Sequence, residues 1–332
     1  MKKRKIVFAV LAGKKKGMGH LARSSLLAES LMPLANISFV ICSKDKLALD
    51  SLNLASRRFK ARFIKESREL KKALAEENPD LVVLDMLSLK TAFLSPRKYR
   101  IVALDNYAKG SDVYINILKS GFESKPLRTK EFSGYKYWLL KKPKRRKKPI
   151  KKVKSVLISF GYTDPLGLSV KVLKSMVPFL KKSDEFKDVR LTCVITSMFR
   201  KGVENDIRRI ARTTGSISIK KDVRDMGNEI LKADLCITGG GNTMFEAISQ
   251  GVPCFVVPIG SRNLGLTREL EKEIYVKVIS KPESIDEAAI HNTFKRLTPS
   301  MIDRMQKACY RYDSQGLERV KKIILNELRA TR

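Results

Sequence analysis

The chain has 332 residues, of which 43% are hydrophobic and 31% are charged. This length suits two domains rather than one core, and the composition excludes wholesale disorder. The 68 Lys and Arg residues outnumber the 34 Asp and Glu residues, which gives a formal net charge of +34. Such a charge attracts nucleic acid, anionic membranes or small phosphate-bearing molecules, although a lysine-rich solvated surface gives the same total.

The five cysteines lie far apart, mostly in apolar runs, and form no C-x-x-C pair. We therefore expect reduced core residues, a cytoplasmic location, and neither a protein-bound metal nor a cofactor. The opening MKKRKIVFAVLAG resembles the start of a signal peptide, but KKK at 14–16 stands where a cleavage site belongs. A buried strand is the better interpretation, because the apolar run is also too short to span a bilayer.

The first half alternates two kinds of segment. Short apolar runs have the length and β-branching of buried strands, and the segments between them repeat apolar residues at helical spacing. Strands are predicted at 6–12, 37–42, 81–85 and 100–105, and helices at 21–31 and 66–80, the second ending at Asn78-Pro79. This order predicts an α/β fold with a parallel sheet over residues 1–145.

The segment KKPKRRKKPIKKVK at 141–154 contains two prolines and almost no apolar residue, so it predicts an exposed interdomain linker. The strand pattern then restarts at 155–161, 189–196, 233–239 and 253–259, which predicts a second Rossmann-like domain over residues 155–313. The remaining residues, 314–332, contain an amphipathic helix from about Gly316 to Leu328. This helix either caps the second domain or packs back across the domains.

The loop GKKKGMGHLAR at 13–23 connects the first strand to the first helix. Ligands of open parallel sheets bind at such loops, where glycines allow close approach and the helix start offers N–H groups. The loop matches neither the P-loop nor the dinucleotide fingerprint. His20 stands at its end, and a site histidine is favoured there over a structural cap. The other histidine, His291, is expected on a helix surface.

Two loops of the second half have the same setting. In SFGYTDP, Gly161 and Thr163 are candidates for phosphate contact, while Asp164 and Pro165 suit an N-cap and a first helical residue. In the run at 233–259, a glycine-rich turn leads into a helix and predicts a diphosphate cradle. Its members are Gly239, Gly240, Gly241, Asn242 and Thr243, and Glu246 one turn later either accepts ribose hydroxyls or is an ordinary acid of the first helical turn.

At these residues the chain resembles the UDP-sugar hydrolases of pseudaminic acid biosynthesis and the related spore-coat polysaccharide proteins. The resemblance covers most of the chain and rests on GMGHLAR with Gly17, Gly19, His20 and Arg23, on FGYTDP, on GGGNTMFEAISQGVP and on DSQGLERV. It implies a GT-B-like fold, in which two Rossmann-like domains face each other across a cleft. The chain departs from the family at two places. The family usually has Asn-Gln where Asn263 is followed by Leu264, and commonly an aromatic residue two positions after the aspartate, where Asp85 is followed by Met86 and Leu87.

The resemblance implies that His20 is the base that activates water for attack at the anomeric carbon, expelling UDP with inversion. It places Gly17, Gly19, Arg23, Asp85 and Asn263 near the sugar and the glycine-rich turn at the nucleotide. A neutral imidazole suits this step because its pKa lies near the working pH.

Two other functions remain open. A glycosyltransferase similar to the one of murein lipid synthesis would use the same base on an acceptor hydroxyl, and the basic surface would suit an anionic membrane. A nucleic-acid-binding protein would explain the charge, but no zinc finger, RNP-like or KH motif supports it, and aromatics make up only 7% of the chain. We therefore expect a UDP-sugar as the partner, not nucleic acid.

Overall fold

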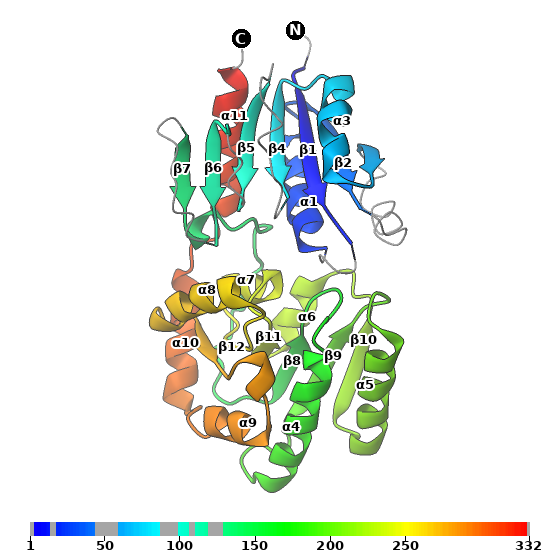
Figure 1. Cartoon of the computed structure of the whole chain (residues 1–332). Coiled ribbons are helices and arrows are strands. Elements are labelled where there is room, and N and C mark those ends of the chain that lie inside the picture. Colours follow the sequence, from blue (N-terminus) through cyan, green and yellow to red (C-terminus); the bar gives the residue numbers. More distant parts are fainter. Residues whose placement is uncertain are drawn as a thin grey trace. The chain divides into compact units, whose positions relative to one another are not determined.

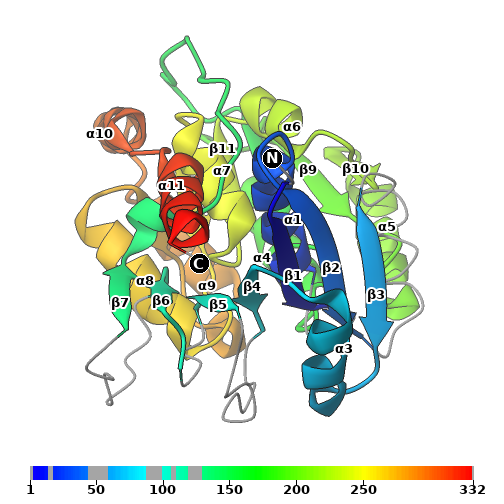
Figure 2. The same ribbon diagram turned by 90° about the horizontal axis from the view of Figure 1, so that it is seen from above.

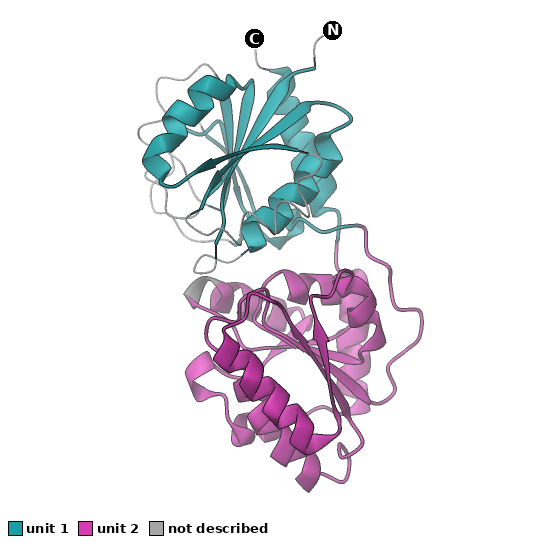
Figure 3. Cartoon of the chain, turned by 90° about the vertical axis from the view of Figure 1, so that its right-hand side faces the viewer, with its two compact units in different colours: residues 1–141, 314–332 teal, residues 142–313 magenta. Residues whose placement is uncertain are grey.

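The computed structural model describes residues 3–13, 18–43, 59–86, 99–105, 110–118 and 129–330. The chain divides into two compact units (Figure 3). Unit 1 consists of residues 1–141 and 314–332, and unit 2 consists of residues 142–313. The change from unit 1 to unit 2 therefore comes a few residues before the expected boundary at 145, and residues 314–332 belong to unit 1.

Unit 1 is built on a parallel sheet with the strand order β3-β2-β1-β4-β5-β6-β7. The four predicted strands of this half are confirmed as β1, β2, β4 and β5. The strands β3, β6 and β7 were not predicted: β6 and β7 have only four residues each, and the edge strands β3 and β7 carry exposed charged residues. The strands are β1 (Lys5–Leu11), β2 (Asn36–Cys42), β3 (Lys60–Ile64), β4 (Leu81–Asp85), β5 (Arg100–Leu104), β6 (Val113–Asn116) and β7 (Lys130–Ser133).

Helices cover both faces of this sheet. Figure 2 shows α1 (Gly19–Leu31) and α11 (Gly316–Arg329) on one face and α3 (Leu70–Glu77) on the other. The described residues of unit 1 also contain two short 3₁₀ helices, η1 (Ser67–Glu69) and η3 (Tyr135–Tyr137). Asn78 adopts a left-handed conformation and ends α3, at the position that the sequence predicted.

Helix α11 is held to unit 1 by charge and by close packing. The buried carboxylate of Glu327 accepts from Arg100 and Lys130, each at 2.8 Å, and so joins α11 to β5 and β7. At its other end a Cβ on Gly316 would lie 2.1 Å from the carbonyl oxygen of Trp138, so only glycine fits there. The expectation that this helix caps the second domain is wrong, because its apolar face is buried in unit 1.

Unit 2 has a second parallel sheet with the order β10-β9-β8-β11-β12-β13 (Figure 1). Its four predicted strands are confirmed, and the short strands β10 and β13 were missed. The strands are β8 (Ser155–Ser159), β9 (Arg190–Ile195), β10 (Ile217–Lys221), β11 (Leu235–Thr238), β12 (Cys254–Val256) and β13 (Val276–Val278). The helices are α4 (Leu168–Lys182), α5 (Lys201–Thr214), α6 (Met226–Lys232), α7 (Asn242–Ser249), α8 (Ser261–Lys272), η4 (Pro282–Ser284), α9 (Glu287–Phe294) and α10 (Pro299–Arg311).

Helix α4 begins later than expected. Pro165 is not its first residue, because Gly167 adopts a left-handed conformation and α4 starts at Leu168. The carboxylate of Asp164 still serves the helix start, since it accepts from the N–H groups of Leu168 and Ser169 at 2.8 Å each. Burial raises the pKa of Asp164 despite these hydrogen bonds.

Two further expectations concern the whole chain. All five cysteines are free and buried, as predicted for core residues. No helix within the described ranges is both long and apolar enough to cross a membrane.

Candidate active site

His20 lies at the carboxyl end of the first sheet, where the chain passes from β1 into α1. It is the second residue of α1, its side chain is 14% exposed, and its Nδ1 lies 2.7 Å from Oδ1 of Asp85. Asp85 is the last residue of β4, the neighbour of β1 in the sheet. Parallel strands bring their carboxyl ends to one edge, which is why residues so distant in sequence meet here. Gly19 begins α1, and Gly17 lies outside the described residues.

The charge state of Asp85 fixes the tautomer of His20. Burial alone would raise the pKa of this carboxyl, but Arg23 and His20 attract its negative charge and hold the pKa well below its usual range. A carboxylate only accepts hydrogen bonds, so Nδ1 of His20 must carry the proton. In the neutral imidazole, Nε2 is then left with a free lone pair, as a general base requires.

Arg23 lies one helical turn after His20 and joins two carboxylates. Its Nε donates to Oδ2 of Asp85 at 2.8 Å, Nη2 donates to Oδ1 of Asp85 at 2.5 Å, and Nη1 donates to Asp105 at 2.5 Å. Nη2 also lies 3.1 Å from Nδ1 of His20, but both atoms carry hydrogen, so they form no hydrogen bond with each other. Burial disfavours the charge of Arg23, yet the two carboxylates outweigh burial and raise its pKa, which keeps the guanidinium a cation.

Asp105, which the sequence did not single out, completes the network. It follows β5 immediately, at the same edge of the sheet, and has a positive φ of 54°. Its second oxygen accepts from the N–H groups of Ile117 and Leu118 at 2.8 and 3.0 Å. The available signal was an aspartate at the carboxyl end of a strand of the same sheet, as for Asp85.

Arg23 and Asp85 were expected to touch the sugar, but the structure gives them other contacts. The side chains of Asp85 and Arg23 are 0% and 8% exposed. Both oxygens of Asp85 accept from protein donors, including Oγ of Ser24 at 2.9 Å. Arg23 and Asp85 therefore support and orient the imidazole of His20, which is the most exposed of these three side chains.

The glycine-rich turn of unit 2 lies between β11 and α7, again at the carboxyl end of a sheet. A Cβ on Gly239 would lie 2.6 Å from Cδ1 of Ile259. Gly240 has a φ of +81°, and a Cβ there would meet Thr267 at 3.1 Å. A Cβ on Gly241 would meet no atom within 4 Å. Backbone conformation therefore favours glycine at 240, a Cβ at 239 would displace the end of the Ile259 side chain, and Gly241 faces open space.

The neighbours of Gly241 are polar and partly exposed. Asn242 and Thr243 begin α7, so their N–H groups belong to the helix start, which lacks intrahelical acceptors. Glu246 is also partly exposed and lies beyond the first helical turn, so the simple explanation as a first-turn acid is wrong. Asn263, in the first turn of α8, lies beside Gly240, with its Cβ 3.6 Å from where a Cβ of Gly240 would stand. Asn263 thus joins the glycine-rich turn within unit 2.

The loop after β8 is at the same edge of the second sheet. Gly161 is exposed and Thr163 is half-buried. The loop is fixed by Asp164 at the start of α4 and by a hydrogen bond from Thr196 to the carbonyl of Tyr162 at 2.5 Å. Unit 2 therefore presents two loops at the edge where a parallel sheet binds ligands.

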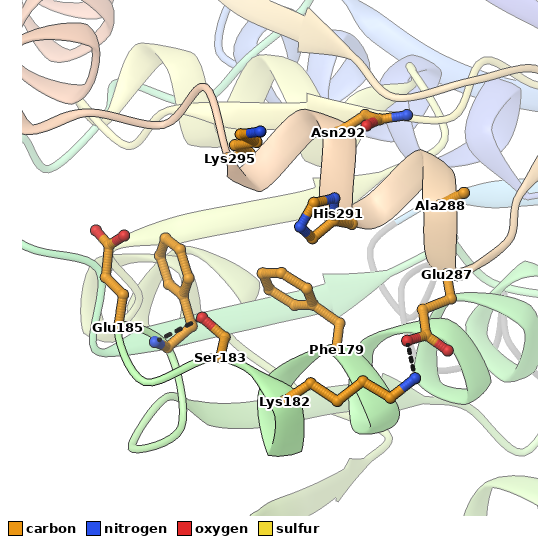
Figure 4. A pocket seen from close by; sticks show the side chains of 10 residues that line it. Phe179, Lys182, Ser183, Glu185, Glu287, Ala288, His291, Asn292 and Lys295 are labelled. Atoms are coloured by element: carbon orange, nitrogen blue, oxygen red, sulfur yellow. Dashed lines mark hydrogen bonds and ion pairs between the residues drawn. The ribbon is translucent and has the colours of Figure 1, made fainter.

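A separate pocket of about 660 Å³ lies between α4 and α9 (Figure 4) and includes none of the predicted site residues. His291 lines it and is exposed, as the sequence predicted, with its ring 6.0 Å from that of Phe179. Lys182 and Glu287 at its rim neutralise each other in an ion pair of 2.7 Å. Among the described residues no cluster of His, Cys, Asp and Glu is suited to hold a metal ion.

Comparison with known proteins finds two curated relatives. No protein-family model matches the chain. An uncharacterized protein of Methanocaldococcus jannaschii is 26% identical over 291 residues, which cover 80% of this chain and only 57% of that protein. The spore coat polysaccharide biosynthesis protein SpsG of Bacillus subtilis is 27% identical over 270 residues, which cover 74% of each chain.

Solved structures share the fold at low sequence identity. MurG of Acinetobacter baumannii has a TM-score of 0.66 at 14% identity and covers 97% of this chain and 99% of its own. The complex of Staphylococcus aureus MnaA with UDP has a TM-score of 0.67 at 15% identity, covering 98% and 97%. The UDP-GlcNAc 2-epimerase of Neisseria meningitidis, bound to UDP-GlcNAc, has a TM-score of 0.65 at 13% identity, covering 97% and 100%. The chain therefore has a GT-B-like fold of two Rossmann-like α/β domains.

Proposed function

We propose that this chain is a UDP-sugar hydrolase, which cleaves the anomeric C–O bond and releases UDP. The observation that carries the proposal is the buried carboxylate of Asp85 on Nδ1 of His20, because it leaves Nε2 free to accept a proton. The likeness to SpsG, named for spore coat polysaccharide biosynthesis, supports a sugar substrate. The UDP and UDP-GlcNAc complexes with the same fold support the nucleotide.

In the proposed reaction, Nε2 of His20 takes a proton from water while the water oxygen bonds to the anomeric carbon. The bond from that carbon to the diphosphate oxygen breaks, and UDP leaves with its electron pair. Attack from the face opposite to UDP inverts the configuration. General-base assistance of this kind is worth about 10²–10⁴ in rate.

We assign binding of the nucleotide to unit 2. The N–H groups at the start of α7 and the positive end of its dipole suit the charge that develops on the leaving diphosphate. Gly241 leaves these groups uncovered, and Asn242 and Thr243 add polar side chains. Glu246 and Asn263 are partly exposed on the two helices beside the turn and suit hydroxyl groups of the ribose and the sugar.

For the sugar, we propose a 2,4-diacetamido-2,4,6-trideoxyhexose, as the resemblance to the pseudaminic acid hydrolases implies. A second candidate function is transfer of the sugar to an acceptor, which the similarity to the MurG fold favours. It uses the same base and the same leaving group, with an acceptor hydroxyl in place of water.

Turnover in ¹⁸O-labelled water separates these reactions. The protein is incubated with a panel of UDP-sugars, with and without alcohol acceptors, and UDP release and label in the sugar are measured. Hydrolysis places ¹⁸O on the anomeric carbon, whereas release that requires an acceptor indicates transfer. The proposal fails if no UDP-sugar is turned over and UDP does not bind.

The two histidines provide a matched pair of variants. His20→Ala should abolish turnover and leave UDP affinity unchanged, because the nucleotide is assigned to unit 2. His291→Ala removes the other imidazole, at the exposed pocket of unit 2, and should leave both quantities unchanged. Equal loss of turnover in both variants would contradict the assignment of His20.

A further inference from the structure

Residues 142–154, here called the basic strap, carry nine Lys or Arg residues and no Asp or Glu. The sequence predicted an exposed interdomain linker, but the strap belongs to unit 2 and runs along it without helix or strand (Figure 3). Two side chains, Ile150 and Val153, are buried in the core of unit 2. The strap is therefore fixed to the surface, and its charges are displayed from an ordered backbone.

Asp234 binds the strap at two points, Arg146 and Lys154. Its Oδ1 accepts from Arg146 at 2.8 Å, and its Oδ2 accepts from the N–H of Lys154 at 2.9 Å. Between these points, Gln306 accepts from the N–H of Ile150 at 2.9 Å and donates to the carbonyl of Lys148 at 3.2 Å. These contacts fix the backbone along its length without using any lysine side chain.

The two arginines of the strap are turned toward the protein. Arg145 donates to the carbonyls of Tyr310 and Tyr312 at 2.8 and 3.2 Å. Arg146 donates to the carbonyl of Ala233 at 2.7 Å in addition to Asp234. The side chains that give planar, two-pronged recognition of phosphates and base edges are thus occupied.

The lysines of the strap, in contrast, face solvent. All seven are exposed, and no acidic side chain in the described part of the chain pairs with any of them. They are Lys142, Lys144, Lys147, Lys148, Lys151, Lys152 and Lys154. Lysine is a hydrated point charge on a flexible stem, and it suits a diffuse layer of negative charge better than a shaped ligand.

We propose that the basic strap is a docking surface for an anionic phospholipid membrane, which holds the protein at the bilayer without insertion. Clusters of four to eight Lys or Arg residues next to a membrane are typical of such electrostatic attachment. The strap contains no aromatic residue on which a nucleic-acid base could stack, and its arginines are occupied, so a lipid surface fits better than nucleic acid. The ordered backbone avoids the entropy loss that a disordered basic segment would suffer on binding.

The test measures co-sedimentation of the full chain with vesicles of phosphatidylcholine alone or with 30% phosphatidylglycerol. Binding is expected only with the anionic lipid, and it should be lost in about 1 M salt, where screening acts within about 3 Å. The triple change Lys147→Gln, Lys148→Gln, Lys151→Gln should weaken binding about 100-fold, since each lysine near the surface contributes ~1 kcal/mol.

A control with equal charge loss shows whether the place of the charges matters. Lys174→Gln, Lys181→Gln and Lys201→Gln change three exposed lysines of α4 and α5. This variant should lose less than about fivefold in affinity, because the strap is intact. Equal losses in both triple variants, or equal binding to neutral vesicles, would overturn the proposal. Tighter binding to duplex DNA or RNA at matched phosphate concentration, lost in the strap variant, would overturn it in favour of nucleic acid.

Discussion

Replacing Asp85 by asparagine tests the central argument about His20, because it removes one charge and almost no volume. Four donor atoms converge on the carboxylate: Nδ1 of His20, Nε and Nη2 of Arg23, and Oγ of Ser24. An amide offers one acceptor oxygen in place of two, and its NH₂ group faces donors. The repulsion between the NH₂ group and the facing donor is relieved most simply if the imidazole changes tautomer, so that Nδ1 accepts from the amide and Nε2 carries the proton.

Two magnitudes follow from these contacts. A protonated Nε2 is not a base, so kcat should fall by the general-base factor of about 10²–10⁴. Breaking a buried ion pair costs ~3–5 kcal/mol. The lower end applies here because Arg23 keeps its contact with Asp105 at 2.5 Å. The folded chain should therefore lose about 3 kcal/mol of unfolding free energy and still fold.

The assay combines turnover with the tautomer itself. The chain has only two histidines, so its ¹⁵N imidazole spectrum contains two ring systems, which His291→Ala assigns. In the wild type, His20 should show a protonated Nδ1 and a bare Nε2, and Asp85→Asn should exchange them. An unchanged tautomer, or a loss of kcat below about tenfold in the folded variant, would refute the reasoning.

Three other outcomes are expected. Gly316→Ala should destabilise the chain by about 3 kcal/mol in urea unfolding, although alanine favours helices, because its Cβ would overlap the carbonyl of Trp138; equal or greater stability would contradict that contact. Gly241→Ala should lower stability by no more than about 1 kcal/mol, the cost of alanine at an N-cap, and weaken UDP binding about tenfold by calorimetry, since its methyl group faces open space at the start of α7; unchanged affinity would remove the turn from the site. The pKa of Asp85 is lower in the folded chain, so its stabilisation is complete above about pH 4 and is lost as the pH falls further, and acid titration of Asp85→Asn should lack this loss.

The fold was predictable for most strands that lie between others, although the four-residue strand β6, between β5 and β7, was missed. The strands β1, β2 and β4 are continuous apolar runs because both faces are buried. The edge strands β3 and β7 read KARFI and KEFS, since one face or one side of an edge strand meets solvent and lysine is tolerated there. The sequence pattern therefore predicts the centre of a sheet better than its borders.

The site was predictable in its members and less so in their roles. His20, Arg23 and Asp85 were singled out, but exposure decides which of them can reach a ligand, and exposure depends on the folded chain. Asp105 was missed although it stands at the carboxyl end of a strand as Asp85 does, and only the fold shows its contact with Arg23, 82 positions away. The three glycines at 239–241 are identical in sequence, and only their neighbours and φ angles distinguish packing from access.

The return of α11 to unit 1 has a consequence for biosynthesis. Unit 2 is an insertion in unit 1, so the ribosome completes all of residues 142–313 before it makes the helix that covers one face of the first sheet. Until then Arg100 and Lys130 lack the carboxylate of Glu327, and the apolar surface under α11 is uncovered. Unit 2 is complete as soon as residue 313 has emerged, whereas unit 1 still lacks its last helix, so we expect the second unit to reach its final fold before the first.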